Sequence, residues 1–195
     1  MFVIPPPKDI EHYRFNVNKN ASTVLFIGNC IGNRASMVAR ERIIKEIAPH
    51  VSDIKFILTG RGCAKFSKDN INSLGFIGNI DHIVENSDIC IAPLEVGSGL
   101  KTKVLTYFSA GKPVIGTSIA FEGFPIEKGV NCIVENNISR YPNRIIELMH
   151  DYKARLKLSK EALKVADYFS PENVFRKWNN LFKMLGSGDT NHLHN

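Results

Sequence analysis

Three short segments of the sequence combine glycine with polar or basic residues: GNCIGNR (28–34), GRGC (60–63) and EVGSGLK (95–101). Glycine lets a backbone approach a ligand closely, and free N–H groups at the start of a following helix attract anions. Each contact with the helix dipole contributes ~0.3–1 kcal/mol, and each hydrogen bond to a charged group roughly 1.5–3 kcal/mol. A few together suffice for micromolar affinity for a diphosphate, about −8 kcal/mol. Any one segment alone reads more simply as a turn, but three at one edge of a sheet favour a nucleotide-type ligand.

Two sharper phosphate-binding motifs are excluded. Gly111-Lys112 is followed by Pro113 rather than by the Ser or Thr of a Walker motif. The turn after the first apolar run contains Gly28 and Gly32 but no G-x-G-x-x-G. An unrelated Rossmann-like enzyme, such as a dehydrogenase, is therefore disfavoured.

The segment 100–110 has the pattern of a helix with two different faces. Its apolar face carries Leu100, Val104, Leu105 and Phe108. Its polar stripe carries Thr102, Thr106 and Ser109, with Lys103 one turn before Thr106. A ligand held at the helix start would meet Lys103 and Thr106 along one side. A solvated polar face is an equally weighted alternative.

Short apolar runs that recur along the chain must position these turns. They are 23–28, 54–60, 73–78, 89–93, 113–117 and 131–135. Between them, 34–48 has Met37, Ile44, Ile47 and Ala48 near helical spacing, and 81–86 is a short polar helix. Runs that are apolar on both faces and alternate with helices predict a doubly wound parallel sheet in one α/β, Rossmann-like domain, followed by C-terminal helices.

The last helix is predicted from Ser170-Pro171 to Gly186, because serine is a good N-cap and proline suits the first turn. Its apolar stripe consists of Val174, Trp178, Leu181 and Leu185, with Phe175 and Phe182 beside it. This stripe is most simply core, or else a docking face for something outside the chain.

Composition narrows the classes of protein. The 195 residues suit one domain with a sizeable core, and the net charge of +6 attracts anions of any kind. Aromatic residues are not interleaved with the cations, so nucleic acid is not expected as a partner. With no apolar run of ~18 residues and no signal-peptide pattern, we expect a cytoplasmic protein; peripheral association with the inner membrane face stays open.

Cysteine and histidine usage predicts no metal site. The four cysteines (Cys30, Cys63, Cys90 and Cys132) form no C-x-x-C pair, and the six histidines have no ligand spacing. We expect the cysteines to be buried and reduced. His192 and His194 fall in the tail 187–195, which we expect to be flexible.

The segment 88–134, DICIAPLEVGSGLKTKVLTYFSAGKPVIGTSIAFEGFPIEKGVNCIV, resembles the donor-binding half of the group 1 (retaining, GT-B) glycosyltransferases. Upstream, VLFIG, KFILTGRG and LGFIGNI follow the family's strand-and-glycine pattern in the same order. FVIPPPKDIEHYRF is similar to its interdomain linker, and YFSPENVFRKWNNLF to its closing helix. The resemblance implies a linker over 1–20 and a donor-binding domain over 21–186.

The resemblance also implies a UDP- or GDP-type sugar donor, with no other cofactor and no metal. Its diphosphate would lie on the backbone of Gly97, Ser98, Gly99 and Leu100, followed by Lys101, and near Arg34. Gly28 and Asn29, where the family usually has arginine after the glycine, together with Gly60, would border the same site. Gly75 and Phe76 would border the base.

Two departures from the family pattern matter. The family's paired glutamates correspond to Ser98 and Thr106, and replacing the second, which holds the ribose hydroxyls, should weaken donor binding by about 1.5–3 kcal/mol. Lys103, which matches a lysine of a related subgroup, would compensate in part. The family's first Rossmann-like half, which carries acceptor-binding and some catalytic residues, has no counterpart in this sequence, so no catalytic residue is assigned.

The sequence therefore predicts a hexosyl-type glycosyltransferase domain that binds a nucleotide sugar. We expect it to transfer sugar to a glycan or lipid-linked acceptor only when an N-terminal half or a partner subunit completes it. The alternative is a non-catalytic nucleotide-sugar-binding or interaction module.

Overall fold

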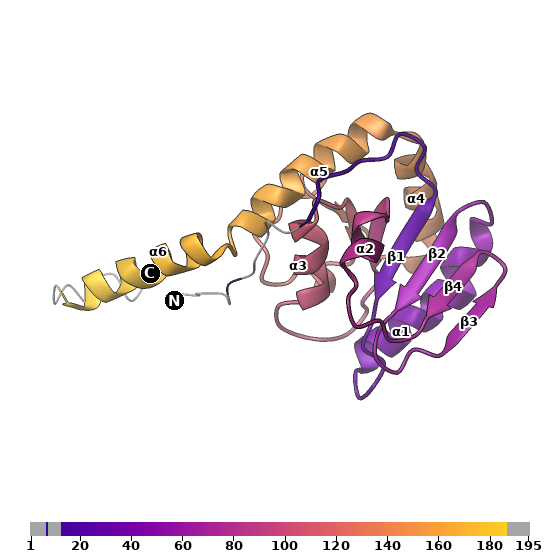
Figure 1. The fold of residues 1–195 in the computed structure, drawn as a ribbon, viewed down its shortest axis with the longest axis horizontal. Coiled ribbons are helices and arrows are strands. Elements are labelled where there is room, and N and C mark those ends of the chain that lie inside the picture. Colours follow the sequence, from indigo (N-terminus) through magenta and orange to yellow (C-terminus); the bar gives the residue numbers. More distant parts are fainter. Residues whose placement is uncertain (1–6, 8–12, 187–195) are drawn as a thin grey trace.

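A seven-stranded sheet of order β3-β4-β2-β1-β5-β6-β7 forms the centre of the computed structural model, which describes residues 7 and 13–186 (Figure 1). The strands are β1 (Thr23–Ile27), β2 (Lys55–Thr59), β3 (Lys65–Lys68), β4 (Ile71–Leu74), β5 (Ile89–Ala92), β6 (Val114–Gly116) and β7 (Ile133–Val134). β3 is antiparallel to β4, and the other paired strands are parallel. The predicted tail 187–195 and most of 1–12 lie outside the described residues.

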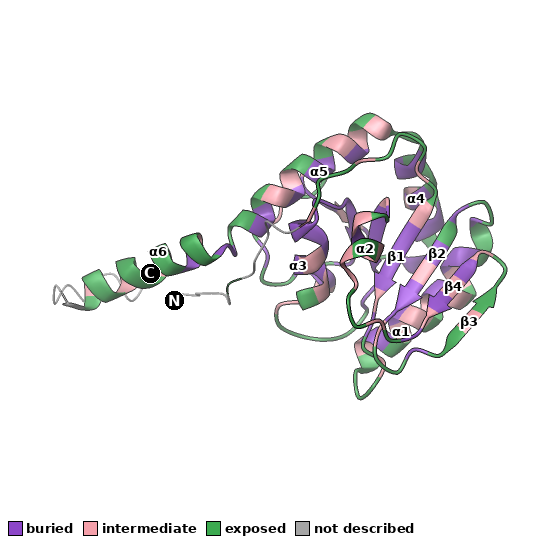
Figure 2. Cartoon of the chain, viewed as in Figure 1, coloured by how far each residue is buried: buried purple, intermediate pink, exposed green. Residues whose placement is uncertain are grey.

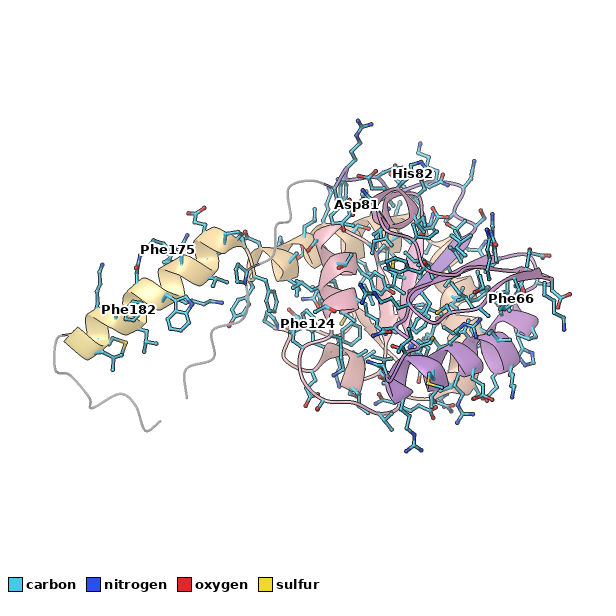
Figure 3. The ribbon with its side chains drawn as sticks, turned by 60° about the horizontal axis from the view of Figure 1, so that its bottom comes forward. Phe66, Asp81, His82, Phe124, Phe175 and Phe182 are labelled. Atoms are coloured by element: carbon cyan, nitrogen blue, oxygen red, sulfur yellow. The ribbon has the colours of Figure 1, made fainter. Side chains whose placement is uncertain are left out.

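Helices cover both faces of this sheet. They are α1 (Arg34–Arg42), α2 (Asp81–Glu85), α3 (Thr102–Ser109), α4 (Tyr141–His150), α5 (Tyr152–Asp167) and α6 (Pro171–Gly186). α1 and α2 lie on opposite faces, as Figures 1 and 3 show. The middle of β1 is buried (Figure 2), and so is the whole of β5, as expected of strands covered on both sides. The predicted α/β, doubly wound fold is confirmed.

The chain reverses its direction of travel across the sheet at β1. It proceeds outward from β1 to β2 and β4, then crosses back to β5 on the other side of β1. Loops leaving the carboxyl ends of such a strand pair diverge and leave a crevice for a ligand. The β1–β5 ladder pairs Val24 with Ile89 and Leu25 with Cys90. Further along, the Ile27 N–H donates instead to the Tyr107 hydroxyl of α3, at 2.7 Å.

Two buried cations fix the described part of the predicted linker. The Arg155 side chain, 1% exposed, donates to the carbonyls of Asn18 and Lys19, at 2.9 and 3.1 Å. Lys112, 2% exposed, donates to the carbonyl of Asn16 at 3.4 Å and to that of Glu85 at 2.6 Å. Residues 14–18 form no helix or strand and are held against the domain by these contacts.

Two strand predictions need correction. Residues 65–68 belong to none of the predicted apolar runs but form β3, an edge strand whose residues are exposed or half-buried and so lack an apolar signal. The run predicted as a strand over 73–78 is instead β4 at 71–74, because Gly75 adopts φ +70 and turns the chain. The apolar residues after it do not continue the sheet, and Phe76 is 60% exposed.

The helix expected over 34–48 ends as α1 at Arg42 and continues as a π-helical segment over Ile43–Ile47 and a 3₁₀ turn over Ala48–His50. Met37 is 52% exposed, whereas Ile43 is fully buried. Ser109, expected on the polar stripe, is buried and donates to the Leu105 carbonyl. Cys63, Cys90 and Cys132 are buried as predicted, but Cys30 is partly exposed.

The apolar stripe of α6 is not core. The helix extends away from the body of the domain (Figure 1), and Val174 at its start is 4% exposed. Further along, Phe175 and Phe182 are 66% and 61% exposed (Figure 3), and Trp178 stacks on Phe182 with ring centroids 5.7 Å apart. The core interpretation is therefore wrong for this face, and a docking face remains a prediction.

Candidate functional site

A cavity of about 500 Å³ lies between the loop that follows β1 and the loop that follows β5. It occupies the crevice expected where the strand order reverses. Its lining comprises Gly32, Asn33, Arg34, Ala35, Ser36, Leu94, Val96, Gly97, Ser98, Leu100, Lys101, Thr102 and Lys103. Two of the three predicted glycine segments, 28–34 and 95–101, thus meet at one site.

The turn before α3 lines this cavity and contains backbone N–H groups that are free of intramolecular partners among the described residues. Gly97 and Gly99 adopt φ +120 and +70, conformations that L side chains rarely adopt. Among the residues that the structure describes, none accepts a hydrogen bond from the N–H groups of 97–103. Lys101 is the N-cap and makes no side-chain capping bond. The positive end of the α3 dipole is therefore available to an anion.

The first turn of α1 closes the opposite wall. The Asn33 side chain caps the helix by accepting from the Ser36 N–H at 2.9 Å. Arg34 follows as the first helical residue and is exposed. Asn33 and Ser36 were not predicted as site residues. An asparagine just before a helical pattern is an N-cap signal that points to this turn.

Lys103 connects the two helices beneath the cavity. Its Nζ donates to the Ser36 hydroxyl at 2.8 Å and lies 4.8 Å from the centroid of the Phe26 ring. Burial lowers the pKa of Lys103 from its usual 10.5 to about 8. The positive charge of Lys101 acts in the same direction, whereas the thiols of Cys30 and Cys63 oppose it. The amine therefore remains mostly charged at neutral pH, and an added anion would favour that form.

The cavity is basic and has no carboxylate in its lining. It contains Arg34, Lys101 and Lys103 and no Asp or Glu. Lys101 Nζ lies 3.4 Å from the Glu122 carboxylate at the margin. Glu95 is close in sequence but pairs with Arg42 at 2.7 Å. Electrostatically, this cavity suits a negatively charged ligand.

The residues at the two glutamate positions are placed differently. Ser98 lines the cavity, whereas Thr106 does not. The Thr106 hydroxyl donates to the Thr102 carbonyl within α3, at 3.1 Å.

The other predicted site residues are not part of the cavity lining. Gly99 belongs to the same turn, between Ser98 and Leu100. Gly60 donates its N–H to the Gly75 carbonyl at 2.9 Å, and a Cβ on Gly60 would come within 1.7 Å of the Gly28 carbonyl oxygen. These glycines let neighbouring strand ends approach closely.

Asn29 and Phe76 are the remaining residues that were predicted to border the donor site. The Asn29 side chain accepts from the Ile31 N–H at 3.2 Å. The Arg61 guanidinium lies 5.5 Å from the Phe76 ring centroid, on the exposed side of the turn after β4. Ligand contacts by these residues stay predictions.

Comparison with known proteins identifies the family. Residues 21–151 match the family model described as glycosyl transferases group 1. The chain belongs to this family. A comparison with curated protein sequences finds no match.

Solved structures agree with this family at the level of the fold. A mutant of TarM from S. aureus, solved in complex with fondaparinux, α-GlcNAc-glycerol and UDP, is 18% identical with a TM-score of 0.74; the match covers 93% of this chain and 39% of TarM. HepE of Anabaena, solved with UDP and glucose, is 15% identical with a TM-score of 0.70, covering 95% of this chain and 56% of HepE. The chain thus spans less than two thirds of either protein.

A third structure has nearly the same extent as this group 1 domain. The C-terminal domain of the group 1 glycosyl transferase LpcC of Francisella tularensis is 13% identical with a TM-score of 0.61, and the match covers 82% of this chain and 96% of that domain. The fold is therefore that of the C-terminal half of a GT-B glycosyltransferase.

Two further findings concern the described residues as a set. No helix among them is long and apolar enough to cross a membrane. In the same part of the chain, no group of three or more His, Cys, Asp or Glu side chains is arranged to hold a metal ion.

Proposed function

We propose that this chain is the donor-binding half of a group 1 glycosyltransferase and binds a UDP- or GDP-type sugar in the cavity between β1 and β5. The observation that carries the proposal is a turn over 97–103 that lines the same cavity as Arg34 and whose N–H groups have no acceptor among the described residues. The diphosphate accepts from these groups at the start of α3. Lys101 and Lys103, which also line the cavity, supply positive charge.

The same arrangement suits the chemistry of the leaving group. Breaking the bond between sugar and nucleotide places negative charge on the diphosphate, and fixed donors aimed at that charge stabilise the transition state. A helix N-terminus with three nearby cations supplies such donors without requiring a metal ion. Lys103 contributes because its side chain is largely removed from water, where charge–charge attraction is stronger.

An acceptor-binding part must complete the enzyme. Transfer requires donor and acceptor to be ordered together, and this chain spans 39% of TarM and 56% of HepE. We propose that an N-terminal half or a partner subunit binds a glycan or lipid-linked acceptor, and that a hexosyl group is transferred. We further propose that the enzyme acts in the cytoplasm, where a net charge of +6 would favour contact with an anionic inner membrane face.

Calorimetric titration of the purified chain tests donor binding. We expect micromolar affinity for a UDP- or GDP-sugar and no measurable affinity for NAD. Arg34→Gln removes one positive charge from the cavity. Its matched control is Lys157→Gln, which removes one positive charge from an exposed position on α5. The proposal fails if neither nucleotide sugar binds, or if Lys157→Gln weakens binding as much as Arg34→Gln does.

A non-catalytic nucleotide-sugar-binding module is the second candidate. It is favoured by the absence of a carboxylate from the cavity lining and by the internal hydrogen bond of Thr106. A Thr106→Glu variant discriminates the two, because a carboxylate accepts two strong bonds from ribose hydroxyls. If the chain is an enzyme half, the variant binds donor about tenfold more tightly and raises transfer in the presence of the acceptor half. Tighter binding with no transfer favours the module.

A further inference from the structure

Two thiols meet beside the proposed donor site although they lie far apart in the sequence. Cys30 follows β1 and Cys63 follows β2, 33 positions later, yet their sulfur atoms are 3.2 Å apart. The sequence indicated no pairing, because the contact arises from the parallel pairing of β1 with β2. Neither thiol has a role in the proposed sugar transfer.

The backbone around the pair fixes this proximity. The Cys30 N–H donates to the Arg61 carbonyl at 2.7 Å, and the Cys63 N–H donates to the Gly60 carbonyl at 3.2 Å. The two loops also touch at Gly62, where an added Cβ would come within 2.6 Å of the Ile31 side chain. These contacts hold the two loops that carry the cysteines next to each other.

The two thiols differ in accessibility, which sets an order of reaction. Cys63 is 8% exposed, and its Sγ lies 3.5 Å from the Gly28 carbonyl oxygen. Burial, with the neighbouring Cys30 thiol, raises the pKa of Cys63 to about 12. Cys30 is partly exposed and borders a second cavity of about 380 Å³, lined also by Met37, Arg40 and Gly62. A small oxidant in this cavity reaches Cys30 first.

We propose that Cys30 and Cys63 are a modification site at which a low-molecular-weight disulfide, such as oxidised glutathione, forms a reversible intramolecular disulfide. The Cys30 thiolate attacks one sulfur of the oxidant, forms a mixed disulfide and releases one thiolate. Cys63 then gives its proton to water and attacks the Cys30 sulfur, which releases the second thiolate; its raised pKa makes this the slower step. Two cysteines are oxidised, and one external disulfide is reduced to two thiols.

The product joins two loops that are already in contact. To form the bond, the sulfur atoms need to approach from 3.2 Å to about 2.05 Å. The bridge ties the loop leading into α1, and therefore Arg34, to the end of β2. A reducing cytoplasm keeps such a pair open, so the bridge forms only when the thiol pool becomes oxidised. The inference is independent of the proposed donor site.

Equilibration of the purified chain with mixtures of reduced and oxidised glutathione tests the proposal. After an acid quench, the protein is unfolded, alkylated, digested and measured by mass spectrometry. We expect a species that carries no glutathione, has two alkylated cysteines instead of four, and yields one cross-linked peptide pair containing Cys30 and Cys63. Dithiothreitol should restore four alkylated cysteines. Cys90 and Cys132, both fully buried, should stay alkylated throughout and serve as internal controls.

Single variants and stability complete the test. Cys63→Ser should stop at a glutathione adduct on Cys30, whereas Cys30→Ser should resist modification. The oxidised wild type should unfold at about 1 M higher urea than the reduced form, because the bridge closes a loop in the unfolded chain. The proposal is overturned by four alkylated cysteines at every ratio, by a lasting wild-type adduct on Cys30, or by a cross-link through Cys90 or Cys132. An unchanged or lower urea midpoint would equally contradict a bridge that fits the native loops.

Discussion

Replacing Lys103 with methionine separates its two roles, as a buried charge and as a proposed contact to the diphosphate. Methionine fills similar space but cannot donate to Ser36. In the wild type, burial lowers the pKa of Lys103 from its usual 10.5 to about 8. In ligand-free protein, the unfolded chain therefore binds more protons than the folded chain between pH 8 and 10.5. The free energy of unfolding should rise with pH across that window, by at most about 3 kcal/mol.

Donor binding should show the opposite dependence on pH. A bound diphosphate restores a high pKa to Lys103, so binding takes up a proton above pH 8. If the amine is half charged near pH 8 in the free protein, the apparent affinity for UDP-glucose or its GDP counterpart falls about tenfold from pH 7 to pH 9. Lys103→Met should bind the same ligand about tenfold to a hundredfold more weakly at pH 7, because one strong charge-assisted bond is lost.

Calorimetry at several pH values and urea unfolding at the same pH values measure both effects. In Lys103→Met, the part of each pH dependence that comes from Lys103 should disappear. Any pH dependence of donor binding that the variant retains, such as that from the nucleotide base, can then be subtracted from the wild-type data. Lys157→Met provides the control for removing an exposed lysine. Equal affinities of wild type and Lys103→Met from pH 7 to 9 would refute the contact. A flat urea stability of the wild type between pH 8 and 10 would refute the buried charge.

Four further substitutions test the backbone and the site. Gly60→Ala should destabilise the fold by more than about 3 kcal/mol in urea unfolding, because its Cβ would clash with the Gly28 carbonyl. Gly99→Ala has no atom within 4 Å of the new Cβ, so it should lower the free energy of unfolding only by the ~1–2 kcal/mol due to its positive φ. An equal loss of stability in Gly60→Ala and Gly99→Ala would count against this distinction. Arg34→Gln should weaken nucleotide-sugar binding about tenfold with an unchanged urea midpoint, and a shifted midpoint would indicate a structural role instead. Arg155→Met should destabilise by about 3 kcal/mol and increase hydrogen exchange over 13–20; unchanged exchange there would argue against the anchoring role.

Much of the fold could be predicted because most of its strands are buried on both faces. Apolar runs located β1, β2, β5, β6 and β7 to within about two residues at most ends. β3 could not be found in this way, since a solvent-exposed edge strand needs no apolar residues.

The site was predictable only as far as its local turns. The glycine turn and Lys103 follow from local sequence, whereas the role of Arg34 came from the family resemblance, and the structure brings all three to one cavity. The contact between Lys103 and Ser36 and that between Cys30 and Cys63 depend on which strands are neighbours, which spacing along the chain does not specify. The helical pattern and the family resemblance both placed Thr106 at the site, but its hydroxyl donates to a carbonyl within α3.

The hydroxyl of Tyr107 keeps the ends of β1 and β5 apart at the point where the strand order reverses. By accepting from the Ile27 N–H, it takes a donor that would otherwise extend the ladder between β1 and β5 and draw their ends together. The fully buried ring of Tyr107 belongs to α3. Its hydrogen bond to β1 therefore fixes the distance between the sheet and this helix, whose N-terminal amides are proposed to bind the ligand. The pocket is thus shaped before anything enters it, and a ligand has little rearrangement to induce on arrival.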